Sequence, residues 1–150
     1  MHMVRDNARR TGREMGFVVA DARQPPVEAV DVVLLDVPCT GTGTLSRHPD
    51  ARWRLRPESI DEMASLQSEM LEAAADVVAP GGLLVYSTCT LEPEENVERV
   101  HAFLRSCPDF EVEAPGSVPA EYVDPEGLLC VTPHGTGFDG AFAARLRKAG

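Results

Sequence analysis

The sequence predicts an α/β protein whose sheet contains neighbouring parallel strands. Residues 32–35 and Val37 form an apolar, mostly branched run, which is typical of a strand buried on both faces. A second short apolar strand, residues 83–86, repeats the arrangement, and an amphipathic pattern over residues 58–79 predicts a helix between them. Strands that alternate with helices in this way are typical of α/β folds.

The other elements follow from hydrophobic periodicity and from turn residues. Ser59 and Glu62 match a capping box at the start of the long helix, and Gly81 with Gly82 is expected to end it. Two further helices are predicted, at residues 3–14 and about 94–106. Short strands are predicted at residues 17–20 (ending at Asp21), 110–112, 128–131 and 141–146, the last two joined by a Gly-rich hairpin turn.

A carboxylate and two thiols follow the two central strands. Asp36 and Cys39 come directly after the first strand, in Asp-Val-Pro-Cys, and Cys89 follows the second in Ser-Thr-Cys. Open α/β sheets bind ligands beyond the carboxyl ends of their strands, so neighbouring parallel strands would bring these side chains to one crevice. For an isolated motif we would favour Asp36 as a turn cap and Cys39 as a small core residue, but the second motif favours a site.

Charge is unevenly distributed along the chain. The net charge is −10, which counts against nucleic-acid binding, yet Arg47, Arg52, Arg54 and Arg56 crowd the loop after Cys39 with only Asp50 opposing them. A local basic rim beside a site can bind phosphate although the whole molecule repels it, and a solvated loop explains the same charges equally well. Trp53, within this loop, is expected to pack the loop onto the body; the alternative is stacking on a base.

Cysteine spacing and hydropathy exclude several classes of protein. The four cysteines (Cys39, Cys89, Cys107 and Cys130) are not spaced as zinc ligands, so no metal site is expected, and reduced thiols fit better than a disulfide scaffold. Cys107 and Cys130 are expected to be packing residues. No apolar run approaches the roughly 20 residues of a membrane helix and no signal-peptide core is visible, which favours a cytoplasmic protein without membrane contact.

Two motifs carry a resemblance to a known family. The segment 36–54, beginning Asp-Val-Pro-Cys-Thr-Gly-Thr-Gly, and the segment 86–96, Tyr-Ser-Thr-Cys-Thr-Leu-Glu-Pro-Glu-Glu-Asn, resemble the NOL1/NOP2/Sun family of RNA cytosine-5 methyltransferases. The ending 139–148 resembles that family's last strand. The resemblance implies methylation of carbon 5 of cytosine in rRNA or tRNA with S-adenosyl-L-methionine as the methyl donor.

The resemblance also implies roles for single residues. Cys89 would be the nucleophile that forms a covalent adduct with cytosine, and Cys39 would assist release of the product. Asp36 would lie between the base and the cofactor, and Asp21 would contact the adenosine part of S-adenosylmethionine. The candidate RNA-binding residues come from the charge of the loop after Cys39 and not from the resemblance; they are Arg47, His48, Arg52 and Arg54.

The family's fold is a Rossmann-like methyltransferase sheet with the strand order 3-2-1-4-5-7-6. By this resemblance the chain is one partial catalytic domain, residues 1–150, without strands 1 and 2 and without the Gly-rich cofactor loop. Either the strand at 17–20 pairs with the strand at 32–35, or the latter keeps an open apolar edge. We expect the open edge, and with it a homodimer or larger assembly. A non-catalytic RNA-binding remnant and a thiol enzyme that does not act on RNA are the alternative functions.

Overall fold

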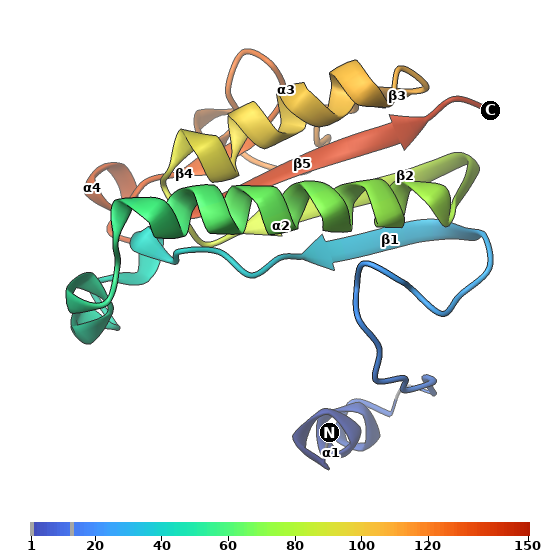
Figure 1. The fold of residues 1–150 in the computed structure, drawn as a ribbon, viewed down its shortest axis with the longest axis horizontal. Coiled ribbons are helices and arrows are strands. Elements are labelled where there is room, and N and C mark those ends of the chain that lie inside the picture. The colour runs from blue at the N-terminus through green and yellow to red at the C-terminus, as the bar shows by residue number, and fades with distance from the viewer. Residues whose placement is uncertain (1, 13) are drawn as a thin grey trace.

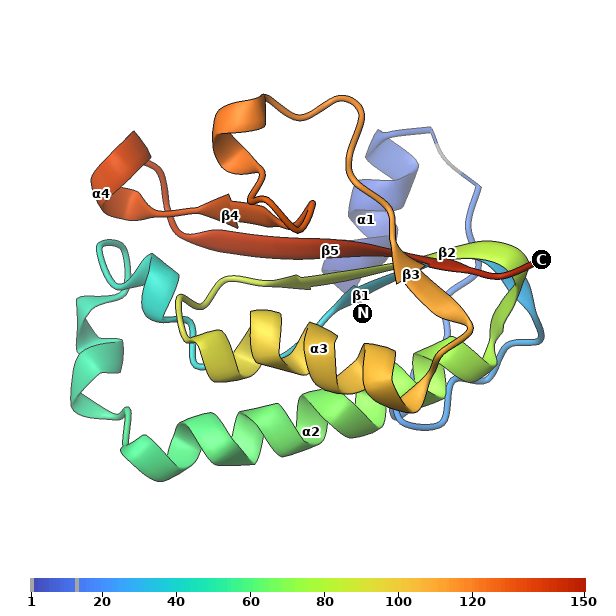
Figure 2. The same cartoon turned by 90° about the horizontal axis from the view of Figure 1, so that it is seen from above.

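The computed structural model describes residues 2–12 and 14–150 and consists of a five-stranded sheet with helices (Figure 1). Figure 2 shows α2 and α3 on one face of the sheet, and α1, α4 and the segment between β3 and β4 on the other side. In chain order the elements are α1 (His2–Arg10), β1 (Val30–Asp36), α2 (Pro57–Asp76), β2 (Val78–Thr88), α3 (Val97–Ser106), β3 (Phe110–Val112), β4 (Leu129–Val131), α4 (Pro133–Thr136) and β5 (Ala141–Lys148). The predicted α/β class is confirmed.

The sheet has the order β1-β2-β5-β3, and β4 pairs with β5 beside β3. β1 and β2 are parallel, as predicted, and their register places Asp36 opposite Ser87. β5 runs antiparallel to β2, β3 and β4. This order corresponds to strands 4-5-7-6 of the sheet that the resemblance implies, whereas the strand expected at residues 17–20 is not formed.

The core lies between the strands β2 and β5 on one side and the helices α2 and α3 on the other. Leu84 and Tyr86 of β2 and Leu146 of β5 have no solvent exposure, and Leu71, Val100 and Phe103 cover them from the helices. Burying one such side chain contributes roughly 1.5–3 kcal/mol. This packing fixes the carboxyl ends of β1 and β2, from which the candidate site extends.

The long helix is confirmed, but the residues expected to cap its start and to end it were wrong. α2 begins at Pro57 with Arg56 at the N-cap, and no side chain caps it, so the expected capping box of Ser59 and Glu62 does not form. Proline suits the first helical position because the amide hydrogen that it lacks would have no partner there. The helix ends at Asp76, and Gly81 and Gly82 lie inside β2.

The N-terminal region differs from the prediction. α1 ends at Arg10, before the expected residue 14; residue 13 lies outside the described residues. Residues 17–20 form no strand, and Val18 and Val19 are 67% and 79% exposed. A strand requires a hydrogen-bonded neighbour, and within the described residues nothing pairs with this segment.

β1 is an edge strand. Val33 and Leu35 face the helices, whereas Val32 and Leu34 are 60% and 71% exposed, so the prediction of a strand buried on both faces was wrong. In the described parts of the chain its second edge has no partner. An open apolar edge can recruit another chain, and association through this edge stays a prediction.

A cluster of charges ties the segment after β3 to β5, and it predicts a pH dependence of stability. The carboxylate of Glu113 pairs with Arg145 and with Arg147, the latter at 2.7 Å, and these hydrogen bonds lower its pKa to about 2. Because the folded pKa is depressed, the stabilisation is present above the unfolded pKa of about 4.5 and is lost as the pH falls toward 2. We therefore expect Glu113→Gln to flatten the decline of the melting temperature between pH 5 and pH 2.

Circular dichroism melts across that pH range measure the effect. Glu111→Gln, at an exposed position of β3, is the matched control, and it should keep the acid sensitivity of the unchanged protein. Identical pH profiles for Glu113→Gln and the unchanged protein would contradict the assigned ion pairs.

Candidate active site

The carboxyl ends of β1 and β2 bring the two predicted thiols together. The Sγ atoms of Cys39 and Cys89 are 3.4 Å apart although the residues are 50 positions apart in the sequence. Beside them the Ser87 hydroxyl donates to Asp36 Oδ1 over 2.9 Å, and the Val37 amide donates to the Ser87 carbonyl. The parallel register therefore places both cysteine loops at the same edge of the sheet, as the sequence predicted.

The two thiols differ in their surroundings. Cys39 is half-buried and Cys89 is exposed. Burial, together with the neighbouring sulfur of Cys89, raises the pKa of Cys39 to about 12, although backbone amides act in the opposite direction. Cys39 therefore keeps its proton at neutral pH, while Cys89 is the thiol that a substrate can reach.

The Gly-rich loop after Cys39 packs backbone against backbone on two other loops. Gly43 donates its amide to the Cys89 carbonyl at 3.0 Å and accepts from the Gly140 amide at 2.8 Å. A Cβ atom on Gly43 would lie 2.7 Å from the Cys89 carbonyl oxygen, so only glycine allows this approach. The loop preceding β5 is thereby joined to both cysteine loops.

The sequence reasoning missed a cluster of buried polar residues next to the two cysteine loops. Glu95 and Gln67 have no solvent exposure, and Thr90 has almost none. Gln67 was detectable because it occupies a core position of α2, between Ala64 and Leu71. Glu95 gave no such signal, because it lies in an acidic turn that resembles a solvated one.

The basic rim lies on the surface of the loop after Cys39. Arg47, His48, Arg52 and Arg54 are all exposed. Arg47 pairs with Asp139 at 2.6 Å, and Arg54 pairs with Asp50 at 2.7 Å. Trp53 is 85% exposed, so the expectation that it packs the loop onto the body was wrong, and stacking on a base remains as its alternative.

Asp21 lies in a turn whose contacts are with α2. Its carboxylate accepts hydrogen bonds from Arg23, which lower its pKa to about 2, and Arg23 also pairs with Glu69 at 3.2 Å. The predicted cofactor residue is thus engaged by an arginine at both oxygens. Asp36, by contrast, accepts only through Oδ1 in the described structure.

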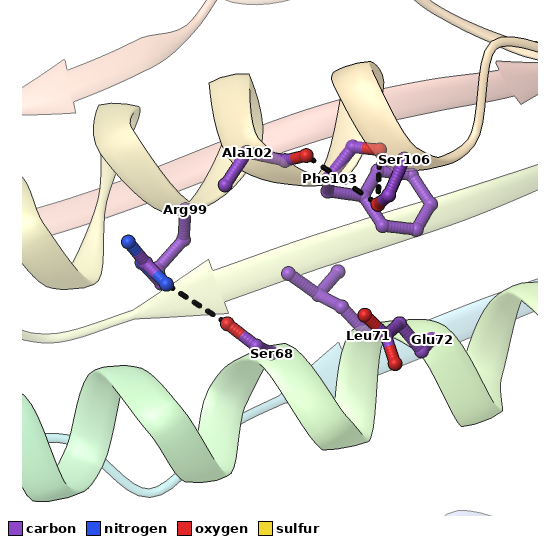
Figure 3. Close-up of a pocket in the computed structure, with 7 residues that line it drawn as sticks. All are labelled: Ser68, Leu71, Glu72, Arg99, Ala102, Phe103 and Ser106. Atoms are coloured by element: carbon purple, nitrogen blue, oxygen red, sulfur yellow. Dashed lines mark hydrogen bonds between the residues drawn. The ribbon is translucent and has the colours of Figure 1, made fainter.

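A pocket of about 180 Å³ lies between α2 and α3 (Figure 3). Arg99 reaches into it, but this guanidinium already donates to Ser68 Oγ at 2.9 Å and to the Glu94 carbonyl at 2.7 Å. Neither cysteine lines the pocket. It is a gap between two helices that Arg99 bridges, and the candidate site stays at the cysteine pair.

Two classes of feature are not found in the described residues. In residues 2–12 and 14–150 no three His, Cys, Asp or Glu side chains converge as a metal-binding group. Among the helices that the structure describes, none has both the length and the apolar character to cross a membrane.

Comparisons with known proteins give a consistent result. The family model for the 16S rRNA methyltransferase RsmB/F matches residues 1–147. Ribosomal RNA small subunit methyltransferase B of Thermus thermophilus is 44% identical over 148 residues, which cover 94% of this chain and 35% of that protein. The chain therefore spans about a third of the length of the curated relatives that it matches.

Two solved structures share the fold. The crystal structure of PH0851 is 40% identical with a TM-score of 0.89, and the match covers 98% of this chain and 34% of that one. NSun6 from Pyrococcus horikoshii, solved with SFG, an analogue of S-adenosylmethionine, is 30% identical with a TM-score of 0.84. That match covers 99% of this chain and 38% of NSun6.

Proposed function

This chain belongs to the 16S rRNA methyltransferase RsmB/F family, part of the NOL1/NOP2/Sun family, and we propose that it carries the cytosine-binding and thiol half of an RNA cytosine-5 methyltransferase site. The observation that carries the proposal is the 3.4 Å contact between Cys39 and Cys89 at the ends of two parallel strands. Disulfide-free thiols at this separation, one exposed and one half-buried, suit a reaction that uses them in succession.

Cys89 is proposed as the nucleophile because carbon 5 of cytosine is too weakly nucleophilic to accept a methyl group unaided. Addition of the Cys89 thiolate to carbon 6 makes an enamine whose carbon 5 is nucleophilic, which divides one hard step into two easier ones. S-adenosylmethionine supplies the electrophilic methyl group. Loss of the carbon 5 proton then re-forms the ring double bond and expels Cys89 as a thiolate.

Cys39 is proposed to act at the release stage. Two effects raise the pKa of Cys39 to about 12 against the opposing backbone amides, and of these burial is the larger and the neighbouring Cys89 sulfur the smaller. Once Cys89 is bonded to carbon 6 its sulfur is a neutral thioether, so the second cause disappears and the pKa of Cys39 falls. A lower pKa lets Cys39 give up its own proton to solvent more readily, and the resulting thiolate is the form that can accept the carbon 5 proton.

Asp36 has a carboxylate oxygen that is free in the described structure, and it fits its proposed position between the base and the cofactor. Asp21 fits its expected contact with the cofactor less well. Asp36 is exposed at the strand end and uses one oxygen for Ser87, which leaves the other for the N3 and N4 edge of cytosine or for the cofactor. Asp21 does not fit in this arrangement, because both of its oxygens accept from Arg23. The target base must also leave its stack to reach the crevice.

RNA binding through the basic rim gives a prediction that does not depend on catalysis. We expect the double variant Arg52→Ala, Arg54→Ala to weaken binding of single-stranded RNA about tenfold and to reduce the salt slope by about 1.4, because each phosphate contact contributes about 0.7 to that slope. Isothermal titration calorimetry at several salt concentrations measures both the affinity for RNA and its salt slope. Arg105→Ala, exposed in the last turn of α3 and away from the cysteine loops, is the control and should change neither value.

The same calorimetry separates the alternative functions. Binding of RNA together with S-adenosylmethionine supports the methyltransferase site. Binding of RNA without the cofactor favours a non-catalytic RNA-binding role of this chain. If neither ligand binds to the folded chain, a thiol enzyme that does not act on RNA becomes the favoured interpretation.

A further inference from the structure

We propose that Glu95 is a positioning residue that holds the two cysteine loops at their working separation. This inference rests on the proposed use of Cys39 and Cys89 in one reaction, and it adds a residue with no assigned role. Glu95 ends the short 3-10 helix η3 (Pro93–Glu95), two residues before the start of α3 at Val97, and has no solvent exposure.

The carboxyl group of Glu95 bonds the residue that follows each cysteine. Oε2 accepts from the Thr40 amide at 3.0 Å, and Oε1 accepts from the hydroxyls of Thr40 and Thr90, the latter at 3.2 Å. Thr40 follows Cys39 and Thr90 follows Cys89. One carboxyl group thus connects two loops that are 50 positions apart in the sequence.

Further hydrogen bonds anchor this connection to the core. Gln67 of α2 donates through Nε2 both to Glu95 Oε2 and to the Pro38 carbonyl, each at 2.9 Å. The peptide units on both sides of Cys39 are therefore held by the Glu95–Gln67 pair. The Tyr86 hydroxyl donates to the Glu95 carbonyl at 2.6 Å, which fixes the backbone of Glu95 against β2.

The burial of the Glu95 carboxyl group explains why its hydrogen bonds fix the positions of the two cysteine loops. A buried carboxyl group without partners is strongly unfavourable, so the loops are stable only where Thr40, Thr90 and Gln67 all reach it. Glutamine at position 95 can keep the acceptor facing the Thr40 and Gln67 N–H groups and can turn its amide NH₂ toward hydroxyl oxygens, which accept. Alanine removes every one of these contacts.

The separation of the two thiols can be measured without RNA or cofactor. In glutathione buffers the two thiols transfer two electrons and two protons to one oxidised glutathione, giving the Cys39–Cys89 disulfide and two reduced glutathiones. The equilibrium ratio gives the effective concentration of one thiol at the other. Cys107→Ser and Cys130→Ser leave this pair alone in the chain.

We expect Glu95→Ala to lower this effective concentration at least about tenfold, and Glu95→Gln to keep it within about threefold of the unchanged protein. Glu98→Ala, which makes the same substitution at an exposed position of α3, should have no effect. An unchanged effective concentration in folded Glu95→Ala would overturn the proposal. Because methylation is not measured, failure of the proposed activity leaves this test intact.

A second variant covers the case in which Glu95→Ala does not fold, as judged by circular dichroism. Thr90→Val keeps the shape of the side chain but removes the hydroxyl that bonds Glu95, Thr40 and Thr42. We expect the effective concentration to fall at least about threefold, because the loss of one typical hydrogen bond changes an equilibrium constant by about that factor. No change in Thr90→Val would reject the positioning role.

Discussion

Replacing Cys89 with alanine is expected to abolish the covalent complex with RNA that contains 5-fluorocytosine. Fluorine at carbon 5 cannot leave as a proton does, so an enzyme that adds Cys89 to carbon 6 becomes trapped on the RNA. Without the nucleophile, methylation of ordinary RNA should fall by at least about 10³-fold. Denaturing gel electrophoresis detects the complex, with the chain fused to the remaining residues of the Thermus thermophilus relative so that the cofactor-binding part of that protein is supplied.

Cys39→Ala should have the opposite effect on the complex. If Cys39 assists release, its removal lets the adduct with ordinary cytosine form and accumulate, so a stable complex should appear without fluorine. Cys130→Ala, an exposed cysteine away from the pair, is the control and should turn over normally. A complex formed by Cys89→Ala would reverse the two assignments, and rapid turnover by Cys39→Ala would remove it from the mechanism.

The meeting of the two thiols could be predicted because the strands that carry them are visible in the local sequence. Apolar runs marked β1 and β2, and parallel pairing of neighbouring strands then required that Cys39 and Cys89 meet at one edge. The insertion of β5 between β2 and β3 had no local signal, and only the resemblance to the family's strand order implied it. Sequence patterns thus located the thiols, while the order of the later strands came from comparison.

The features that the sequence reasoning missed or predicted wrongly depend on contacts between segments that are distant in the sequence. An acidic turn gives no local indication that Glu95 is buried, because its burial is produced by Thr40 and Gln67 from distant segments. The segment 17–20 has a good strand composition, but within the described residues no neighbouring strand satisfies its backbone. Trp53 was expected to pack its loop onto the body, yet its side chain is 85% exposed.

Gly43→Ala is expected to destabilise the fold and to separate the cysteine loops. The added Cβ would lie 2.7 Å from the Cys89 carbonyl oxygen, 2.8 Å from Gly140 Cα and 2.9 Å from the Gly140 carbonyl oxygen. All three are backbone atoms, so no side-chain rotation relieves the contacts and the loops themselves must move. Overpacking of this kind costs about 1–3 kcal/mol, which for a chain of this length lowers the melting temperature by roughly 3–10 °C.

Thermal unfolding followed by circular dichroism measures that cost, and Gly116→Ala provides the matched control. A Cβ on Gly116 would meet no atom within 4 Å, so this variant should melt within about 1 °C of the unchanged protein. Because Gly43 bonds both the Cys89 carbonyl and the Gly140 amide, its displacement should also weaken disulfide formation between Cys39 and Cys89. An unchanged melting temperature in Gly43→Ala would mean that the three loops can move apart without cost, and the close backbone packing would then not be what holds the thiols together.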